Sequence, residues 1–275
     1  MLDINKIKNT ILQGDTLKTL KQIPDKSVNM VITSPPYWGL KNYGIDGQLG
    51  VERTFNEYIV NLILIFNETK RVLREDGVCF VNIGDTYSAN RPYQITGTKQ
   101  VEGSQPDIGK QPQAKDNNYQ VKCLYCIPDR FKIAMIDNGW ICRNEIIWHK
   151  PNAMPQSVKD RFTDDYEKIF LFSKNKKYYF EQQKEIALNG KTRNVRSVWS
   201  INTKPLKEAH FATYPEKLIE TPIKSGCPED GIVLDIFMGS GTTGVVAKKL
   251  HRNYIGIELN PEYIEIANSR IKGII

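Results

Sequence analysis

Short apolar runs alternate with longer amphipathic segments along most of this chain. The apolar runs are rich in β-branched and aromatic residues, as buried strands are, and they occupy residues 11–13, 28–32, 78–83, 140–148, 166–172, 233–237 and 254–258. Residues 55–73 instead carry apolar side chains at spacings of three and four, which predicts a long amphipathic helix that ends at Asp76-Gly77. Shorter helices are predicted over residues 16–23, 128–138 and 245–250, and from Pro261 after the cap Asn260.

This alternation predicts the α/β class, with one domain over residues 1–275. We expect a doubly wound, mostly parallel sheet with helices on both faces. Residues 86–120 depart from the pattern, because they hold three Pro, three Gly and six Gln with little apolar periodicity. They predict a long, mobile surface loop. Residues 149–155 predict a second, rigid polar loop, and residues 178–180 predict strand core.

The composition excludes several classes of protein. No stretch approaches the roughly 20 consecutive apolar residues of a membrane span, and the N-terminus lacks the layout of a signal peptide, so we expect an intracellular, cytoplasmic protein. Five cysteines in a chain of 275 residues predict reduced thiols rather than a disulfide framework. Cys123 and Cys126 have the spacing of zinc ligands, but no second pair follows, so no metal site is predicted.

The net charge of +7 is concentrated in one part of the chain. Residues 168–207 contain ten Lys or Arg and two Glu, a local charge of +8. A basic cluster on an otherwise neutral body is typical of a surface that binds a polyanion. A solvated, lysine-rich surface is the alternative interpretation.

A proline-rich motif, Thr33-Ser34-Pro35-Pro36-Tyr37, follows the apolar run at residues 28–32. Adjacent prolines hold φ near roughly −65° and contribute no N–H, so the loop is stiff and rich in hydrogen-bond acceptors. A hydroxyl and peptide carbonyls can accept both protons of an NH2 group, and Tyr37 offers an aromatic face. The motif therefore predicts a binding site for an exocyclic amino group on a flat ring.

A glycine-rich turn follows the apolar run at residues 233–237. Gly239, Gly241 and Gly244 lie between a predicted strand and a predicted helix, and Glu258 ends the next strand, as in dinucleotide-binding sites. Asp235 would repel a pyrophosphate but suits a cofactor with an ammonium group. Only 31 residues follow Gly244, too few for the second half of a dinucleotide fold, so S-adenosylmethionine fits better than NAD.

Together, the motifs at residues 33–37 and 235–244 resemble those of the DNA amino-methyltransferases, which methylate cytosine N4 or adenine N6. The order of the motifs, catalytic first and cofactor last, resembles the β class of that family. The resemblance covers nearly the whole chain and implies a circularly permuted, Rossmann-like methyltransferase fold with a small, irregular target-recognition region. It also implies S-adenosyl-L-methionine as cofactor and double-stranded DNA as partner, with a cognate restriction endonuclease and a homodimer as further partners.

The resemblance implies roles for individual residues. Catalytic roles fall on Ser34, Pro35, Pro36 and Tyr37. Cofactor contacts fall on Asp15, Thr33, Lys217, Asp235, Phe237, Gly239, Ser240, Gly241, Thr242, Thr243 and Glu258. Residues 183–207 are the expected recognition segment, and 86–120 are expected to close over DNA. The candidate DNA contacts are Lys184, Lys191, Arg193, Arg196, Lys204 and Lys207.

The identity of the target base is the main alternative left open. The Ser-Pro-Pro-Tyr form resembles the N4-cytosine enzymes more than the N6-adenine enzymes, which typically carry Asp or Asn at the position of Ser34. The same reaction on adenine N6 is therefore the first alternative. A nicotinamide-dependent oxidoreductase, supported by the glycine turn alone, and a non-catalytic DNA-binding module are more distant ones.

Overall fold

The computed structural model describes residues 1–40, 44–88, 119–187, 189–204 and 214–274. Most of the loop predicted at residues 86–120 lies outside these ranges, as does Lys207. The strands are β1 (Thr10–Gln13), β2 (Val28–Thr33), β3 (Leu73–Ile83), β4 (Ile141–His149), β5 (Tyr166–Ser173), β6 (Lys184–Ile186), β7 (Thr192–Asn194), β8 (Val198–Ser200), β9 (Ile232–Asp235) and β10 (Asn253–Glu258). The helices are α1 (Ile4–Ile7), α2 (Thr16–Leu20), α3 (Phe55–Val72), α4 (Ile127–Asp137), α5 (Glu216–Gly226), α6 (Thr242–Lys249) and α7 (Pro261–Lys272).

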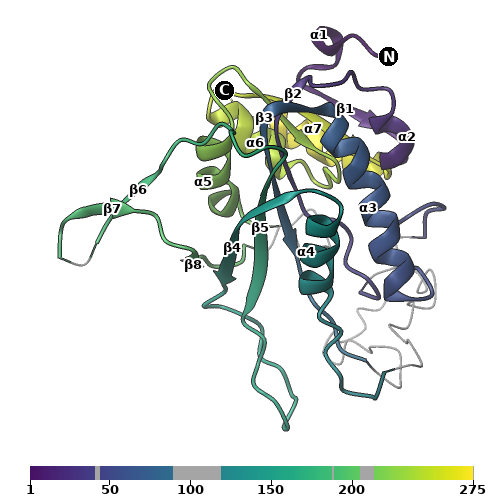
Figure 1. The fold of residues 1–275 in the computed structure, drawn as a ribbon, viewed down its shortest axis with the longest axis vertical. Helices are drawn as coiled ribbons and strands as arrows, with labels where there is room; N and C mark the ends of the chain where they lie inside the picture. Colours follow the sequence, from purple (N-terminus) through teal and green to yellow (C-terminus); the bar gives the residue numbers. More distant parts are fainter. Residues whose placement is uncertain (41–43, 89–118, 188, 205–213, 275) are drawn as a thin grey trace.

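Eight strands form one sheet in the order β1-β10-β9-β2-β3-β5-β4-β8 (Figure 1). From β1 to β3 every neighbouring pair is parallel, β5 is antiparallel to both β3 and β4, and β8 is parallel to β4. The last two strands of the sheet in sequence, β9 and β10, therefore lie between the first two, β1 and β2. The prediction of a mostly parallel, permuted α/β sheet is confirmed.

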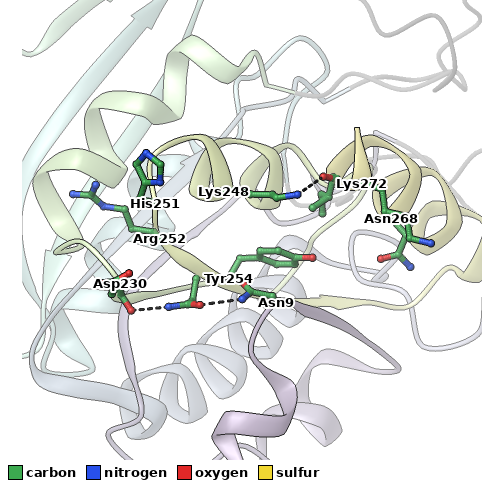
Figure 2. Close-up of a pocket in the computed structure, with 10 residues that line it drawn as sticks. Asn9, Asp230, Lys248, His251, Arg252, Tyr254, Asn268 and Lys272 are labelled. Carbon is green, nitrogen blue, oxygen red and sulfur yellow. Dashed lines mark hydrogen bonds between the residues drawn. The ribbon is translucent and has the colours of Figure 1, made fainter. Parts of the chain in front are cut away.

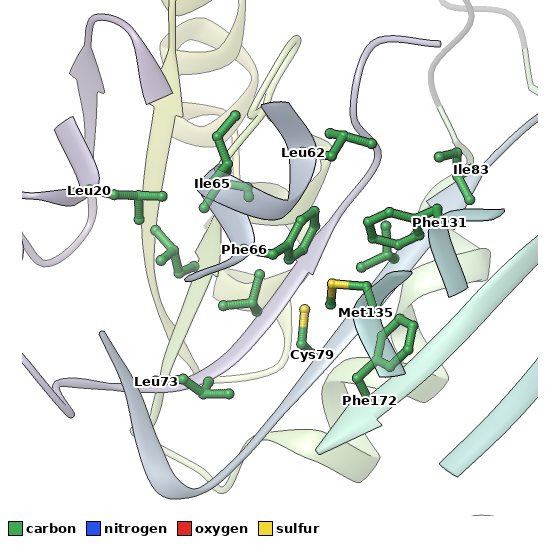
Figure 3. Close-up of a cluster of buried hydrophobic side chains, with 14 of the residues drawn as sticks. Leu20, Leu62, Ile65, Phe66, Leu73, Cys79, Ile83, Phe131, Met135 and Phe172 are labelled. Atoms are coloured by element: carbon green, nitrogen blue, oxygen red, sulfur yellow. The ribbon is translucent and has the colours of Figure 1, made fainter. Parts of the chain in front are cut away.

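Alternate residues of the central strands enter two separate cores. One core lies under α2, α3 and α4 and is shown in Figure 3, where Phe66 of α3, Phe131 of α4 and Phe172 of β5 surround Cys79 of β3. The other core lies under α5, α6 and α7 and contains Met30 of β2. Burial on both faces explains why these strands are continuous apolar runs rather than alternating ones.

Helix α3 begins at a capping box, in which the Thr54 side chain accepts from the backbone N–H of Glu57 and the Glu57 side chain accepts from that of Thr54. The predicted end of this helix was wrong. The helix ends at Val72, and residues 74–77 lie in an irregular part of β3, where Leu73 pairs with Val28. A Cβ on Gly77 would lie 2.6 Å from the Leu73 side chain, so this glycine belongs to the bend and not to a helix stop.

Other elements also differ from the prediction. Helix α2 ends at Leu20 rather than at residue 23, and α6 begins at Thr242 rather than at residue 245, so the glycine turn is shorter. Residues 178–180 form no strand, and Phe180 is 40% exposed, because β5 ends at Ser173. The predicted cap at Asn260 is confirmed, since its side chain accepts from the N–H of Glu262. No helix among the described residues is long and apolar enough to cross a membrane.

Candidate functional site

Four of the predicted site segments, the two motifs and the surroundings of Asp15 and Glu258, meet at one edge of the sheet. They follow β1, β10, β9 and β2, and parallel strands bring their carboxyl ends to the same edge. Hydrogen bonds join them in sequence across the edge: Gly14 N–H donates to the Glu258 carbonyl (2.9 Å), and Gly239 N–H donates to the Glu258 carboxylate (2.7 Å). The Thr33 hydroxyl donates to Asp235 (2.7 Å). The proline-rich motif and the glycine turn, about 200 residues apart in sequence, are thus in direct contact.

Asp235 is the centre of this contact and is 1% exposed. Its Oδ1 accepts from Thr33 and from the N–H of Phe237, and its Oδ2 accepts from Tyr214 (3.0 Å) and Thr243 (2.5 Å). Burial raises the pKa of Asp235, even though four donors point at its oxygens. Tyr214 and Thr243 also share a hydrogen bond with each other (2.6 Å), so at most three hydrogens reach Asp235 at once, and its contacts in the described chain are with its own neighbours.

Glycine is favoured at the three positions of the turn for different physical reasons. Gly241 has φ +83°, and a Cβ there would lie 2.7 Å from Ala267 of α7. A Cβ on Gly244 would lie 2.5 Å from Ile271, so both glycines allow α6 and α7 to pack closely. At Gly239, with φ +51°, a Cβ would meet nothing nearer than 4.0 Å. Of the three, Gly239 alone leaves open space of the kind that a ligand can enter.

Two acidic side chains flank the open glycine at the ends of adjacent strands. Glu258 accepts from the N–H groups of Gly239 and Asn260 (2.7 and 2.8 Å), and burial raises its pKa. Asp15 accepts from the Lys18 N–H (2.9 Å) and so caps α2. Each carboxylate keeps lone pairs that can accept from a ligand's hydroxyl or amino groups.

The remaining cofactor candidates fall into two groups. Ser240 and Thr242 are buried and accept from Arg270 of α7, whose guanidinium donates to the Ser240 carbonyl (2.6 Å) and hydroxyl (2.8 Å). Phe237 is partly buried against the core under α3. Lys217 is exposed in the first turn of α5. The structure brings the first three to the glycine turn and leaves Lys217 on the surface.

The proline-rich motif is held firmly by its surroundings. The Tyr58 hydroxyl of α3 donates to the Pro36 carbonyl (2.8 Å), and Pro35 is buried. A Cβ on Gly84 would lie 2.5 Å from the Tyr37 ring, so the ring lies directly against the backbone that follows β3. Ser34 is partly buried, and its hydroxyl donates to the Tyr37 oxygen at 3.4 Å, a long contact.

Three polar residues beside Tyr37 were not predicted from the sequence. The Tyr37 hydroxyl donates to Glu167 of β5 (2.7 Å), which also accepts from Asn82 of β3 (3.0 Å) and from Lys150. Only the antiparallel pairing of β5 with β3 and β4 places these residues together. The sequence signal that could have indicated these residues was the polar character of residues 149–155 between two predicted strands.

The candidate DNA-binding residues lie on and beyond the β6–β7 hairpin, which extends away from the sheet (Figure 1). Lys184, Lys191, Arg196 and Lys204 are exposed. Arg193 forms an ion pair with Glu185 across the hairpin (2.7 Å). Two cations of the basic segment at 168–207 are already paired within the protein, because Lys168 pairs with Asp129 and Glu145, and Lys174 with Glu75.

A pocket of about 510 Å³ lies away from this site, between the ends of α6 and α7 (Figure 2). Several of its polar groups bond to one another: Asn9 donates to Asn253, and Asn253 donates to the Asp230 carbonyl. Lys248 and Arg252 donate to backbone carbonyls at the ends of helices. We therefore assign this pocket a structural role. Among the described residues, no group of three or more His, Cys, Asp or Glu could hold a metal ion.

Proteins similar to this chain include two type II methyltransferases. The chain is 45% identical over 270 residues to the type II methyltransferase M.Cfr9I of Citrobacter freundii, covering 96% of this chain and 88% of that protein. It is 40% identical over 275 residues to the type II methyltransferase M.SmaI of Serratia marcescens, covering 98% and 93%.

Solved structures share the fold. The PvuII DNA methyltransferase (cytosine-N4-specific) aligns with a TM-score of 0.69 at 24% identity, covering 94% of this chain and 85% of that one. A putative DNA modification methylase of Thermus thermophilus, complexed with S-adenosyl-L-methionine, aligns with a TM-score of 0.63 at 23% identity, covering 95% and 94%. A family model described as DNA methylase matches residues 28–269, and the chain belongs to this family of N6- and N4-directed DNA methylases.

Proposed function

We propose that this chain is the methyltransferase of a type II restriction-modification system. In this proposal it transfers a methyl group from S-adenosyl-L-methionine to the N4 amino group of cytosine in double-stranded DNA. The observation that carries the proposal is the contact of the acceptor-rich motif at 33–37 with the glycine turn through the Thr33–Asp235 hydrogen bond (2.7 Å). This contact brings the proposed amino-group site beside the proposed cofactor site, and the similarity to two type II methyltransferases supports the biological context.

The residues at the sheet edge fit the proposed cofactor. Gly239 leaves space for close approach, Glu258 can accept from ribose hydroxyls, and Asp15 can accept from an adenine amino group. Asp235 acts indirectly, because it fixes Thr33, Thr243 and Tyr214 around the turn. When bound, the cofactor supplies a methyl group that is electrophilic because it is attached to a sulfonium.

The chain's part in the chemistry is to prepare the amino nitrogen. The lone pair of an exocyclic amino group is delocalised into its ring, which makes the nitrogen a poor nucleophile. The Ser34 hydroxyl oxygen and the Pro35 carbonyl can each accept one N–H of that group. Two such hydrogen bonds favour a pyramidal nitrogen whose lone pair points away from the ring, and positioning of this kind lowers the barrier. No covalent intermediate with a cysteine is required.

A base in duplex DNA cannot reach this motif while it is stacked, so it must leave the helix at a cost of a few kcal/mol. Stacking on the Tyr37 ring, worth roughly 1–3 kcal/mol per base, would offset part of that cost. The ring is suited to this because its contact with Gly84 fixes its plane.

One residue, Ser34, favours cytosine over adenine as the target base. Ser34 stands where the resemblance places Asp or Asn in most N6-adenine enzymes. The structural similarity to a cytosine-N4-specific methyltransferase, at 24% identity, bears on the fold alone. Methylation of adenine N6 by the same site is the second candidate.

Methylation of mixed-sequence DNA, followed by digestion and nucleoside analysis, tests the proposal. We expect N4-methylcytosine; N6-methyladenine would assign the other base, and transfer of no methyl group would contradict the function.

The Ser34→Ala variant tests the role of the acceptor. We expect the methyl-transfer rate to fall by about 100-fold or more, because one of two hydrogen bonds to the reacting group is lost. Cofactor affinity, measured by calorimetry, should not change. Ser269→Ala is the matched control, since Ser269 is exposed on α7. Full activity of Ser34→Ala would show that the motif does not act in this way.

A further inference from the structure

Glu167 is a largely buried carboxylate next to the proposed base site to which the scheme above assigns no role. It lies on β5, and its side chain is 17% exposed. Its Oε2 accepts from the Tyr37 hydroxyl (2.7 Å) and from the Asn82 amide (3.0 Å), and its Oε1 accepts from the Lys150 ammonium. Three donors from three different segments therefore converge on this one group.

The charge of Glu167 is compensated by its neighbours. Lys150 is 19% exposed in its side chain, and its ammonium group lies 4.6 Å from the centre of the Trp148 ring. Asn82 is 5% exposed, and its amide also donates to the Lys168 carbonyl (3.2 Å), which fixes which way the amide faces. The Glu167 carboxylate is thus paired with one cation and accepts hydrogen bonds from two further donors.

A carboxylate paired with a lysine accepts hydrogen bonds, and this determines the direction of its bond with Tyr37. The single hydroxyl hydrogen of Tyr37 points to Glu167, because this contact (2.7 Å) is shorter than the contact with the Asn82 oxygen (3.3 Å). Burial and the charge of Glu167 raise the pKa of Tyr37 well above its ordinary value, so the hydroxyl keeps this hydrogen.

The direction of that bond determines the role of Ser34. With its hydrogen given to Glu167, the Tyr37 oxygen can serve Ser34 only as an acceptor, so in their contact (3.4 Å) Ser34 donates. The lone pairs of the Ser34 oxygen then stay available for the N–H of a substrate amino group. Without the carboxylate, Tyr37 could donate to Ser34 and occupy one of those lone pairs. Without the Tyr37 oxygen, the Ser34 hydrogen would lose its acceptor and could turn toward the substrate amino group.

We propose that Glu167 is a positioning residue, which acts through the Tyr37 hydroxyl to keep the Ser34 oxygen an acceptor for the target amino group. This inference rests on the proposed function. Lys150 and Asn82 hold Glu167 in place, so that four segments of the chain together set the polarity of one serine hydroxyl.

The test is a double-mutant cycle of Glu167→Gln and Tyr37→Phe, with the single-turnover methyl-transfer rate, the cofactor affinity and the melting temperature measured for each protein. We expect each single variant to lower the rate on the order of 10-fold, with unchanged cofactor affinity. In the Tyr37→Phe background, Glu167→Gln should cost no more than about 3-fold, because the group through which Glu167 acts is already gone. Glu167→Asp, which keeps the charge, should recover part of the rate.

Glu145→Gln is the matched control. Glu145 also lies in the sheet and also pairs with lysines, Lys132 (2.5 Å) and Lys168 (3.2 Å), but it has no hydrogen bond to Tyr37. We expect this variant to melt at a lower temperature and to keep the wild-type rate.

Several outcomes would overturn the inference. One is a wild-type methyl-transfer rate for Glu167→Gln or for Tyr37→Phe. Another is a double variant whose loss of rate equals the product of the losses in the two single variants, because the two residues would then act independently. If Glu167→Gln does not fold, Tyr37→Phe decides alone, because it leaves the Glu167–Lys150 pair intact and a wild-type rate there contradicts the role. Failure of the proposed function is distinguishable, because then the wild-type protein itself would transfer no methyl group to DNA.

Discussion

Single residues in the glycine turn serve two different purposes. The backbone at Gly241 has φ +83° and lies so close to Ala267 that a Cβ would be 2.7 Å away, whereas at Gly239 a Cβ would enter open space. A motif of three glycines thus combines one position that is open to a ligand with two that are closed by helix packing.

This difference predicts opposite phenotypes for two alanine variants. Gly241→Ala should lower the free energy of unfolding by about 1–3 kcal/mol, because strain and a backbone clash add, and its cofactor affinity per folded molecule should change little. Gly239→Ala should lower the free energy of unfolding by only about 1 kcal/mol, because alanine is strained at a left-handed φ. It should, however, bind the cofactor weakly, because the added Cβ enters the space open to a ligand. Chemical denaturation and calorimetry measure both quantities. Equal effects on stability and affinity in the two variants would contradict the division of roles.

At the scale of elements, the β6–β7 hairpin is the feature that differs most from the rest of the fold. Its described residues, 184–187 and 189–194, are held by cross-strand contacts of the hairpin itself, which include the Arg193–Glu185 ion pair and the bond from Lys184 to Asn194. Its exposed cations are therefore available to a polyanion. We propose that this hairpin and the residues that follow it, within 183–207, contact DNA.

The double variant Lys191→Ala/Arg196→Ala tests this proposal. We expect weaker DNA binding and a slope of log affinity against log salt that is smaller by about 2, since each phosphate contact contributes roughly one unit. Cofactor affinity should be unaffected. Lys272→Ala is the control, because Lys272 is exposed at the end of α7. An unchanged salt slope in the double variant would exclude phosphate contacts by these two residues.

At the scale of the whole molecule, ion pairs join α4 to the antiparallel half of the sheet. Lys132 of α4 pairs with Glu145 of β4, and Lys168 of β5 pairs with Asp129 of α4 and with Glu145. Burial opposes the ionisation of Glu145, but the hydrogen bonds from Lys132 and Lys168 outweigh it and lower its pKa below the ordinary value of 4.5.

This lowered pKa predicts how stability depends on pH. Because the folded state binds the proton of Glu145 less tightly than the unfolded state, its contribution is fully present above pH 4.5 and is lost as the pH falls through the folded pKa. Glu145→Gln should therefore be less stable than the wild type at pH 7, by about 1 kcal/mol, and the difference should shrink below pH 4.5. Urea denaturation at a series of pH values checks this. A difference that stays constant down to about pH 3 would contradict it.

Local sequence was sufficient to predict most of the strands and helices and both motifs. The hydrophobic period and the backbone preferences of glycine and proline act within a few residues, so they can be recognised in the sequence. It was insufficient where a tertiary contact decides, as at Asp76-Gly77, which lie in β3 because Leu73 pairs with Val28. It also could not show that the Asp235 carboxylate accepts hydrogen bonds from β2, α6 and Tyr214.

The amino-acid sequence by itself determined the α/β class, the order of the two motifs and the chemical character of Ser34, Pro35 and Gly239, because these depend on residue type and short-range spacing. Only the tertiary structure decided which groups act on them. The insertion of β9 and β10 between β1 and β2 places Asp235 against Thr33. The antiparallel β5 places Glu167 against Tyr37, a contact between residues 130 positions apart. No local pattern encodes such a distance, because strand order and register are set by the burial of two cores at once.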